Sequence, residues 1–177
     1  VLIGIGVLGC DTRTPLPTLT QVDSFELVSD QGEVFGTAQL SGKVWVANFV
    51  FTTCPSVCPL LTTHMANLRA GLEDTEVQFV SFSVDPATDT PEVLRAYRTR
   101  MDAHGEGWTF LTGEHEAVRR AIEGQMRVMM GERAGGDIPH SMHFILVDRT
   151  GHIRGFYNSS DREELARLTT DARRLDE

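Results

Sequence analysis

The stretch of sequence that decides the fold is FVFTTCPSVCP, residues 49–59. It joins two patterns of different period. The apolar run over 44–51 is typical of a buried strand, and an apolar residue then recurs at helical spacing. The recurring residues are Leu61, Met65, Leu68 and Leu72. The sequence therefore predicts a strand that leads through two cysteines into a helix ending near Gly71.

Cys54 and Cys58 lie where the predicted strand gives way to the helix. If both lie in the first helical turns, their Cβ atoms are about 5–6 Å apart. That distance is slightly wider than the ~3.5–4.5 Å of a relaxed disulfide, and it also suits two sulfurs on one soft metal ion. The N-terminus of a helix favours thiolate over thiol. Two small buried hydrophobic residues are the alternative, but the flanking prolines and the strand-to-helix position favour a reactive site.

Size and composition indicate an ordinary globular protein. The chain has 177 residues, 41% of them hydrophobic and 23% charged, which fits one domain with a sizeable core. The net charge of −9 and the lack of a basic stripe argue against nucleic acid and anionic lipid as partners. No exposed apolar helix face stands out, and we expect a monomer.

The third cysteine, Cys10, ends an apolar segment that is too short to cross a bilayer. Residues 1–18 are interpreted as the remnant of a signal or membrane-anchor segment followed by a linker, and residues 19–177 as the folded domain. The sequence VLGC (7–10) is similar to a bacterial lipobox, which makes Cys10 a lipidation candidate. The tail of an uncleaved membrane anchor and a buried apolar arm are the alternatives.

The remainder of the chain alternates strand and helix patterns. Segments 24–28 and 33–35 flank a turn and predict a hairpin with Gly32 at an unusual φ. The further strands predicted are 77–84, 108–112, 142–148 and 152–157, the last two forming a second hairpin. Together with the helices between them, they predict a three-layer α/β domain.

Three further helices are predicted. Thr90 is the expected N-cap of one, with a proline in its first turn. Another has an apolar face of Val118, Ile122, Met126 and Met129 and is closed by Gly131. Core packing is favoured for its methionines, Met130 included, over thioether metal ligation. The last has a capping box at 160–163 and the apolar face Leu165, Leu168, Ala172 and Leu175.

Four segments resemble, in the same order, the Sco/SenC family of copper-binding assembly factors. FTTCPSVCP (51–59) matches the TxCPxxCP motif of that family. The other segments are SVDP (83–86) with DTP (89–91), HS (140–141) ahead of FILVD (144–148), and GHIRGFY (151–157). The resemblance covers residues 19–175 and implies a thioredoxin-like fold.

The resemblance also implies a function. Members are periplasmic or intermembrane copper chaperones that support assembly of the dinuclear copper centre of cytochrome c oxidase. The implied partners are the oxidase subunit that carries this centre and a periplasmic thiol reductant or another copper carrier. The implied location is the bacterial periplasm, with a lipid or helix anchor tethering the protein to the cell membrane.

Carried onto this chain, the family's metal ligands are Cys54, Cys58 and His140. Two thiolates select copper, above all Cu(I), and an imidazole can stay bound to Cu(II) as well. His143 is the rival histidine. If the strand already runs through both histidines, they point to opposite faces, and only one of them can face the cysteines. The family pattern places the ligand directly before Ser141, which favours His140.

Three other residues near the implied site carry weaker expectations. Family members often have Asp where this chain has Pro139, a position similar to the cis-proline that faces the cysteines of thioredoxins. Asp85 could tune His140 or a thiol, or it could simply be a turn residue before a proline. His64 is expected to be exposed, away from the cysteine face of its helix.

Other functions use the same residues. A thiol–disulfide oxidoreductase would use Cys54 and Cys58 as a redox dithiol acting on the cysteines of the oxidase copper site, with or without a copper role. A peroxidase is disfavoured because Phe51 and Ala47 stand where peroxiredoxins carry a threonine and a proline. A structural zinc module lacks a fourth ligand.

Overall fold

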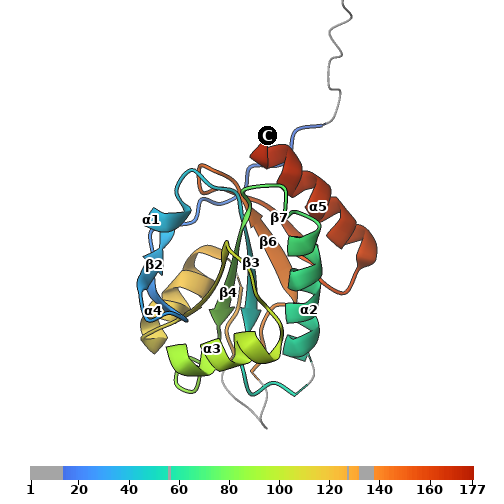
Figure 1. The fold of residues 1–177 in the computed structure, drawn as a ribbon. Coiled ribbons are helices and arrows are strands. Elements are labelled where there is room, and N and C mark those ends of the chain that lie inside the picture. The colour runs from blue at the N-terminus through green and yellow to red at the C-terminus, as the bar shows by residue number, and fades with distance from the viewer. Residues whose placement is uncertain (1–13, 56, 127, 132–137) are drawn as a thin grey trace, which may run out of the picture.

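The computed structural model describes residues 14–55, 57–126, 128–131 and 138–177. Its centre is a seven-stranded mixed sheet in the order β2-β1-β5-β4-β3-β6-β7 (Figure 1). The strands are β1 (Glu26–Ser29), β2 (Val34–Gly36), β3 (Trp45–Val50), β4 (Gln78–Ser83), β5 (Trp108–Thr112), β6 (His143–Val147) and β7 (Ile153–Asn158). Strands β3, β4 and β5 are parallel, whereas β1 and β6 pair with this core in the antiparallel direction.

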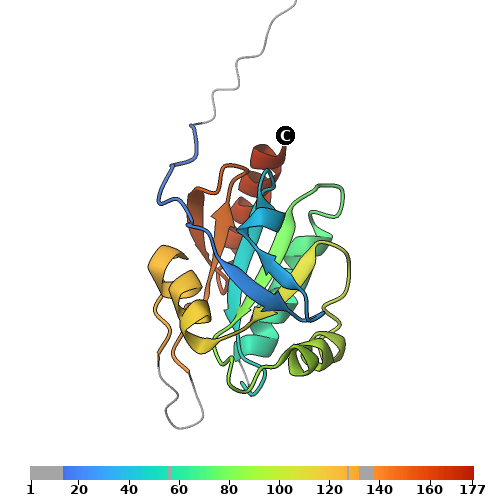
Figure 2. The same cartoon turned by 90° about the vertical axis from the view of Figure 1, so that its left-hand side faces the viewer.

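Helices cover both faces of the sheet, as predicted for a three-layer domain. Helices α2 (Val57–Ala70), α3 (Pro91–Arg100) and α5 (Arg162–Asp176) lie on one face, and α4 (His115–Arg119) with the continuing π-helical segment η1 (Arg120–Gln125) lies on the other (Figures 1 and 2). A short helix that the sequence did not reveal, α1 (Thr37–Leu40), follows β2. The thioredoxin-like α/β prediction is confirmed.

The central strand is buried along its whole length. Every residue of β3 is buried, and so are five of the six residues of β4. Leu61, Met65 and Leu68 of α2 pack into the same core, and Leu72 follows just beyond the helix end. The apolar run and the helical spacing therefore predicted this packing correctly, because the apolar residues in both patterns are the ones that face the core.

Turn and cap chemistry was also largely predictable. Gly32 adopts φ +82° between β1 and β2, where residues with a side chain are disfavoured. Thr90 caps α3 by accepting the N–H of Val93. In α5, however, Asp161 is the cap and accepts the N–H groups of Glu163 and Glu164, so the capping box placed on Ser160 was wrong by one residue.

The methionine-rich helix differs from its prediction. The segment turns π-helical at Arg120 and ends at Gln125, before the apolar pattern runs out. Met126 and Met130 are buried, as core packing requires, but Met129 is 84% exposed. The predicted apolar face therefore held for the first methionine and failed for Met129, because the helical segment ends before Met129, and Met129 is exposed between the buried Val128 and Met130.

The described N-terminal residues run along the outer edge of β7. The guanidinium of Arg154 donates to the carbonyls of Leu16 and Pro17 and forms an ion pair with Asp148. The N–H of Leu19 donates to the carbonyl of Ile153. No helix within the described residues is long and apolar enough to cross a membrane.

Candidate metal centre

Topology brings the two cysteines and His140 to one end of the sheet. The cysteine loop leaves β3 at its C-terminal end. Strand β6 runs antiparallel to β3, with Ala47 opposite Ile145, so the residues that lead into β6 lie beside those that leave β3. The Nε2 atom of His140 lies 3.7 Å from Sγ of Cys58. The three residues predicted as ligands thus share one site.

Cys54 lies just before α2, which begins at Val57, so only Cys58 is in the first helical turn. The condition that both cysteines lie within the helix is therefore not met. Instead, the N–H of Cys58 donates to Sγ of Cys54 at 3.3 Å. Sulfur thus caps one of the N–H groups that a helix start leaves unpaired. Both cysteines are free thiols and are buried.

Phe51 contacts all three of these residues. Its N–H donates to Sγ of Cys58 at 3.4 Å, and its carbonyl accepts the N–H of Cys54 at 3.3 Å. Its ring meets the imidazole of His140 edge-on, with the ring centres 5.6 Å apart. Because Phe51 is fully buried, its backbone and ring form a fixed support for the site.

The imidazole of His140 is oriented by its own loop. Its Nδ1 lies 3.0 Å from the carbonyl of Ile138, an acceptor, which places the proton on Nδ1 and leaves the Nε2 lone pair facing Cys58. His143 is exposed at the start of β6 and pairs with Ser141. The geometry therefore selects His140 over His143. The peptide bond before Pro139 is trans, so the expected likeness to a thioredoxin cis-proline was wrong.

Burial dominates the ionisation of Cys58. Desolvation raises the pKa of this thiol well above its ordinary value, and hydrogen bonding and charge from Cys54 add to the rise. The N–H of Phe51 lowers the pKa but does not outweigh burial. The expectation that the helix start favours thiolate is therefore wrong for Cys58 in the metal-free protein, because desolvation raises the pKa more than the hydrogen bond from the Phe51 N–H lowers it.

The donor set fits a soft metal ion with an open coordination sphere. Two sulfurs and one neutral imidazole nitrogen suit copper, and three ligands fall short of a closed tetrahedral zinc site. Among the described residues, no three His, Cys, Asp or Glu side chains stand close enough together to hold a metal ion as they are. Metal binding at this site would therefore require the sulfurs to adjust and to lose protons.

Sequence reasoning missed the role of Asp89, which is hydrogen-bonded to Thr52 in the loop that leads to Cys54. Its carboxylate is fully buried and accepts hydrogen bonds from the hydroxyl of Thr52 at 2.5 Å and from that of Ser83 at 2.6 Å. The N–H of Thr52 also points to it, 3.2 Å from Oδ1. Desolvation raises the pKa of Asp89 despite these bonds. In the sequence, Asp89 stands out only as the residue before a helix cap and as part of the DTP segment of the family resemblance.

The structure agrees with the turn role considered for Asp85 and disagrees with the exposure expected of His64. Asp85 is buried at the end of β4, where its carbonyl accepts the N–H groups of Thr88 and Asp89, and this is the role expected of a turn residue. His64 is half-buried against α5 rather than exposed, with its Nδ1 shielded from solvent. The packing of α5 against α2 joins segments about a hundred residues apart, which local spacing does not record. Cys10 lies outside the described residues.

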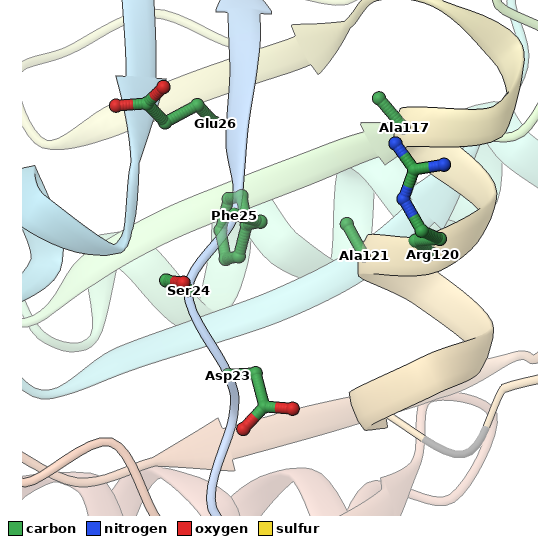
Figure 3. A pocket seen from close by; sticks show the side chains of 7 residues that line it. All are labelled: Asp23, Ser24, Phe25, Glu26, Ala117, Arg120 and Ala121. Carbon is green, nitrogen blue, oxygen red and sulfur yellow. The ribbon is translucent and has the colours of Figure 1, made fainter.

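Several surface pockets lie away from the cysteines. One of about 330 Å³ is formed by the segment that leads into β1, with Asp23 and Phe25, and by α4 and η1, with Ala117 and Arg120 (Figure 3). Its polar groups are ordinary surface side chains, with Asp23 and Arg120 both exposed. The candidate centre is a largely buried cluster, and its cysteines do not line this pocket.

Comparison with known proteins identifies the family of this chain. Residues 14–174 match the SCO1/SenC family. A solved SCO1/SenC family lipoprotein from Bacillus anthracis is 35% identical, with a TM-score of 0.83 over 89% of this chain and 96% of its own.

Two other similar solved structures are of proteins that bear on function. BsSco, a member of the Sco family of cytochrome c oxidase assembly proteins in which a disulfide switch was identified, is 27% identical with a TM-score of 0.82, covering 93% of this chain and 98% of its own. Copper-bound ScoI of Bradyrhizobium japonicum is 26% identical with a TM-score of 0.71, covering 88% of this chain and 99% of its own.

Proposed function

The chain belongs to the SCO1/SenC family, and on that basis we propose that it is a copper-binding metallochaperone for cytochrome c oxidase. Its role is to deliver copper to the dinuclear copper site of the oxidase, or to prepare that site, during assembly. The relatives described as copper-bound and as oxidase assembly proteins support this function.

One observation supports this function most directly: the 3.7 Å approach of His140 Nε2 to Cys58 Sγ beside a second buried thiol. In the proposed site Cys54, Cys58 and His140 are the ligands. The two sulfurs hold Cu(I), and the imidazole keeps the site able to hold Cu(II). An open coordination position suits a carrier, because the ligands of the recipient must reach the metal before it is released.

Spectroscopy of the copper-loaded protein tests the proposal. The reduced protein should bind one copper ion and, with Cu(II), show thiolate-to-copper charge-transfer bands. Single replacements of Cys54 and Cys58 by Ser should abolish these bands, and His140→Ala should change them. Binding weaker than micromolar, or spectra that all three replacements leave unchanged, would contradict the copper function.

A second function rests on the contact between the two cysteines. The hydrogen bond from the Cys58 N–H to Cys54 Sγ brings the two cysteines close together, and no disulfide joins them in this structure. A small shift at the helix start would allow a disulfide. The protein would then act as a thiol–disulfide oxidoreductase on the oxidase cysteines, and the disulfide switch of BsSco supports this activity.

The proposed location is the outer side of the bacterial cell membrane. A lipid on Cys10, or a helix that precedes it, would tether the domain there, and the lipoprotein from Bacillus anthracis supports this. The proposed partners are the copper-carrying oxidase subunit and a thiol reductant or copper donor of the same compartment. Mass spectrometry of Cys10 in membrane-extracted protein tests the anchor.

A further inference from the structure

Thr52 lies two residues before Cys54. Each of its polar groups is hydrogen-bonded to α3 or to the turn that precedes α3. Its N–H and its hydroxyl both donate to Asp89. Its carbonyl accepts a hydrogen bond from the guanidinium of Arg100, at the far end of the same helix, at 3.3 Å. A loop residue held in this way has little freedom to change its backbone conformation.

The next residue back, Phe51, makes the contacts to all three proposed ligands. The peptide group that joins Phe51 to Thr52 has the carbonyl that accepts the Cys54 N–H and the N–H that donates to Asp89. Moving Thr52 would therefore move the Phe51 carbonyl beneath Cys54. It would also disturb the Phe51 N–H that points to Cys58 and the ring that supports His140.

Asp89 is itself rigidly held. It is fully buried, its second oxygen accepts the hydroxyl of Ser83 at 2.6 Å, and its own N–H donates to the carbonyl of Asp85. The residue that follows it, Thr90, caps α3. The Thr52 N–H and the hydroxyls of Thr52 and Ser83 all donate to Asp89, so a carboxylate satisfies all three, whereas an amide replaces one of the two acceptor oxygens with a donor.

We propose that Asp89 is a positioning residue that sets the geometry of the copper site through Thr52 and Phe51, without touching the metal. This inference rests on the proposed copper function. Residues that orient metal ligands at one remove typically change affinity about 10–100-fold when they are altered. Asp89→Asn should therefore weaken copper binding by about 10–100-fold and shift the charge-transfer bands, with both cysteines and His140 still present.

Three further variants make the test specific. Thr52→Val removes the hydroxyl and should act in the same direction, whereas Thr52→Ser retains it and should stay close to wild type. Because the two residues act as one unit, Asp89→Asn combined with Thr52→Val should weaken binding less than the two single effects predict together. Asp171→Asn alters another buried carboxylate, which accepts the hydroxyl of Tyr157 on α5's side of β7, and should leave copper binding unchanged.

A measurement on the metal-free reduced protein separates this inference from the copper function. Amide hydrogen exchange at Thr52 and Cys54 should speed up in Asp89→Asn and stay as in wild type in Asp171→Asn.

If the wild type binds copper and folded Asp89→Asn binds it equally well with unchanged bands, the inference fails. If the wild type binds no copper, the copper function fails, and unchanged exchange at Thr52 and Cys54 in Asp89→Asn would then overturn the positioning role. Should Asp89→Asn not fold, Thr52→Val decides by the same readouts.

Discussion

The imidazole of His140 reaches Cys58 across 82 positions of sequence, with Nε2 3.7 Å from Sγ. This approach depends on the carbonyl of Ile138, which holds the opposite ring nitrogen at 3.0 Å. The ring therefore presents an unprotonated nitrogen to the buried thiol. Such an arrangement is ready to accept either the thiol proton or a metal ion.

The first prediction separates the two neighbouring histidines. His140→Ala should weaken copper binding by at least the ~10–100-fold that is typical of losing a supporting partner, because it removes the imidazole nitrogen that lies 3.7 Å from Cys58 Sγ. His143→Ala is the matched control and should bind copper as the wild type does, since that ring is exposed and pairs with Ser141. Competition titrations against a chelator of known affinity measure both. Equal losses in the two variants would exclude His140 as the specific ligand.

The second prediction concerns protons. Because burial raises the pKa of Cys58, this residue is a thiol at neutral pH in the metal-free protein. Copper binds thiolate, so binding must release the Cys58 proton. Calorimetric titrations at pH 7 in two buffers of different ionisation enthalpy should give different apparent heats, and affinity should rise with pH by about tenfold per unit for each proton released.

Cys58→Ser serves as the control for this release. It should lose one proton from the balance, together with much of the affinity. Heats that do not depend on the buffer in the wild type would show that Cys58 is already ionised before copper arrives.

Much of the fold could be predicted because its determinants are local. The apolar run before Cys54, the spacing of Leu61 and Met65, the Thr90 cap and the Gly32 turn each record burial or backbone geometry within a few residues. Met129 was misplaced because the helical segment ends before it, whereas the apolar spacing in the sequence continues without marking that end.

The candidate site was predictable in its members and not in its energetics. Cys54, Cys58 and His140 were identified through the family resemblance, whereas the pKa of Cys58 depends on how completely distant segments bury it. The Asp89–Thr52 contact spans 37 positions and two loops, and a side-chain hydrogen bond of this kind has no periodicity. The sequence does not show long-range packing or the desolvation that shifts a pKa.

The third prediction concerns a buried polar chain across the sheet. The Ser81 hydroxyl donates to Asn48 Oδ1 at 2.6 Å and accepts the indole N–H of Trp108 at 2.9 Å. Ser81→Ala would leave a buried donor and a buried acceptor without partners, and we expect a loss of about 1–3 kcal/mol in the free energy of unfolding. Urea unfolding of the reduced, metal-free protein measures it.

Ser159→Ala is the matched control for Ser81→Ala. Ser159 is also fully buried, but its hydroxyl has no hydrogen-bond partner within the part of the chain that the structure describes. Removing a hydroxyl that pairs with nothing should cost little or should stabilise the fold. Similar losses in the two variants would mean that side-chain packing, and not the hydrogen bonds of Ser81, accounts for the effect.

The fourth prediction concerns stability in acid. Asp148 is almost buried and forms a 2.7 Å ion pair with Arg154, which also holds the N-terminal segment. Desolvation raises the pKa of Asp148, but hydrogen bonds from Thr150, His152 and Arg154 outweigh it, and the pKa lies below its ordinary value. The folded protein therefore binds this proton more weakly than the unfolded chain does. The resulting stabilisation is complete above the unfolded pKa of about 3.9 and is lost as pH falls through the folded pKa.

Asp148→Asn should consequently cost about 1.5–3 kcal/mol near pH 7, as expected for hydrogen bonds to a charged group, and progressively less below pH ~4. Urea unfolding of wild type and variant between pH 7 and pH 3 measures the difference.

Asp74→Asn is the matched control, because Asp74 also pairs with an arginine, Arg173, but its side chain is 65% exposed. Solvent and salt screen such a pair, so its removal should cost less and the cost should fall further in high salt. A cost for Asp148→Asn that does not change with pH would show that the asparagine disrupts packing, and that the charge of Asp148 is not what stabilises this corner of the fold.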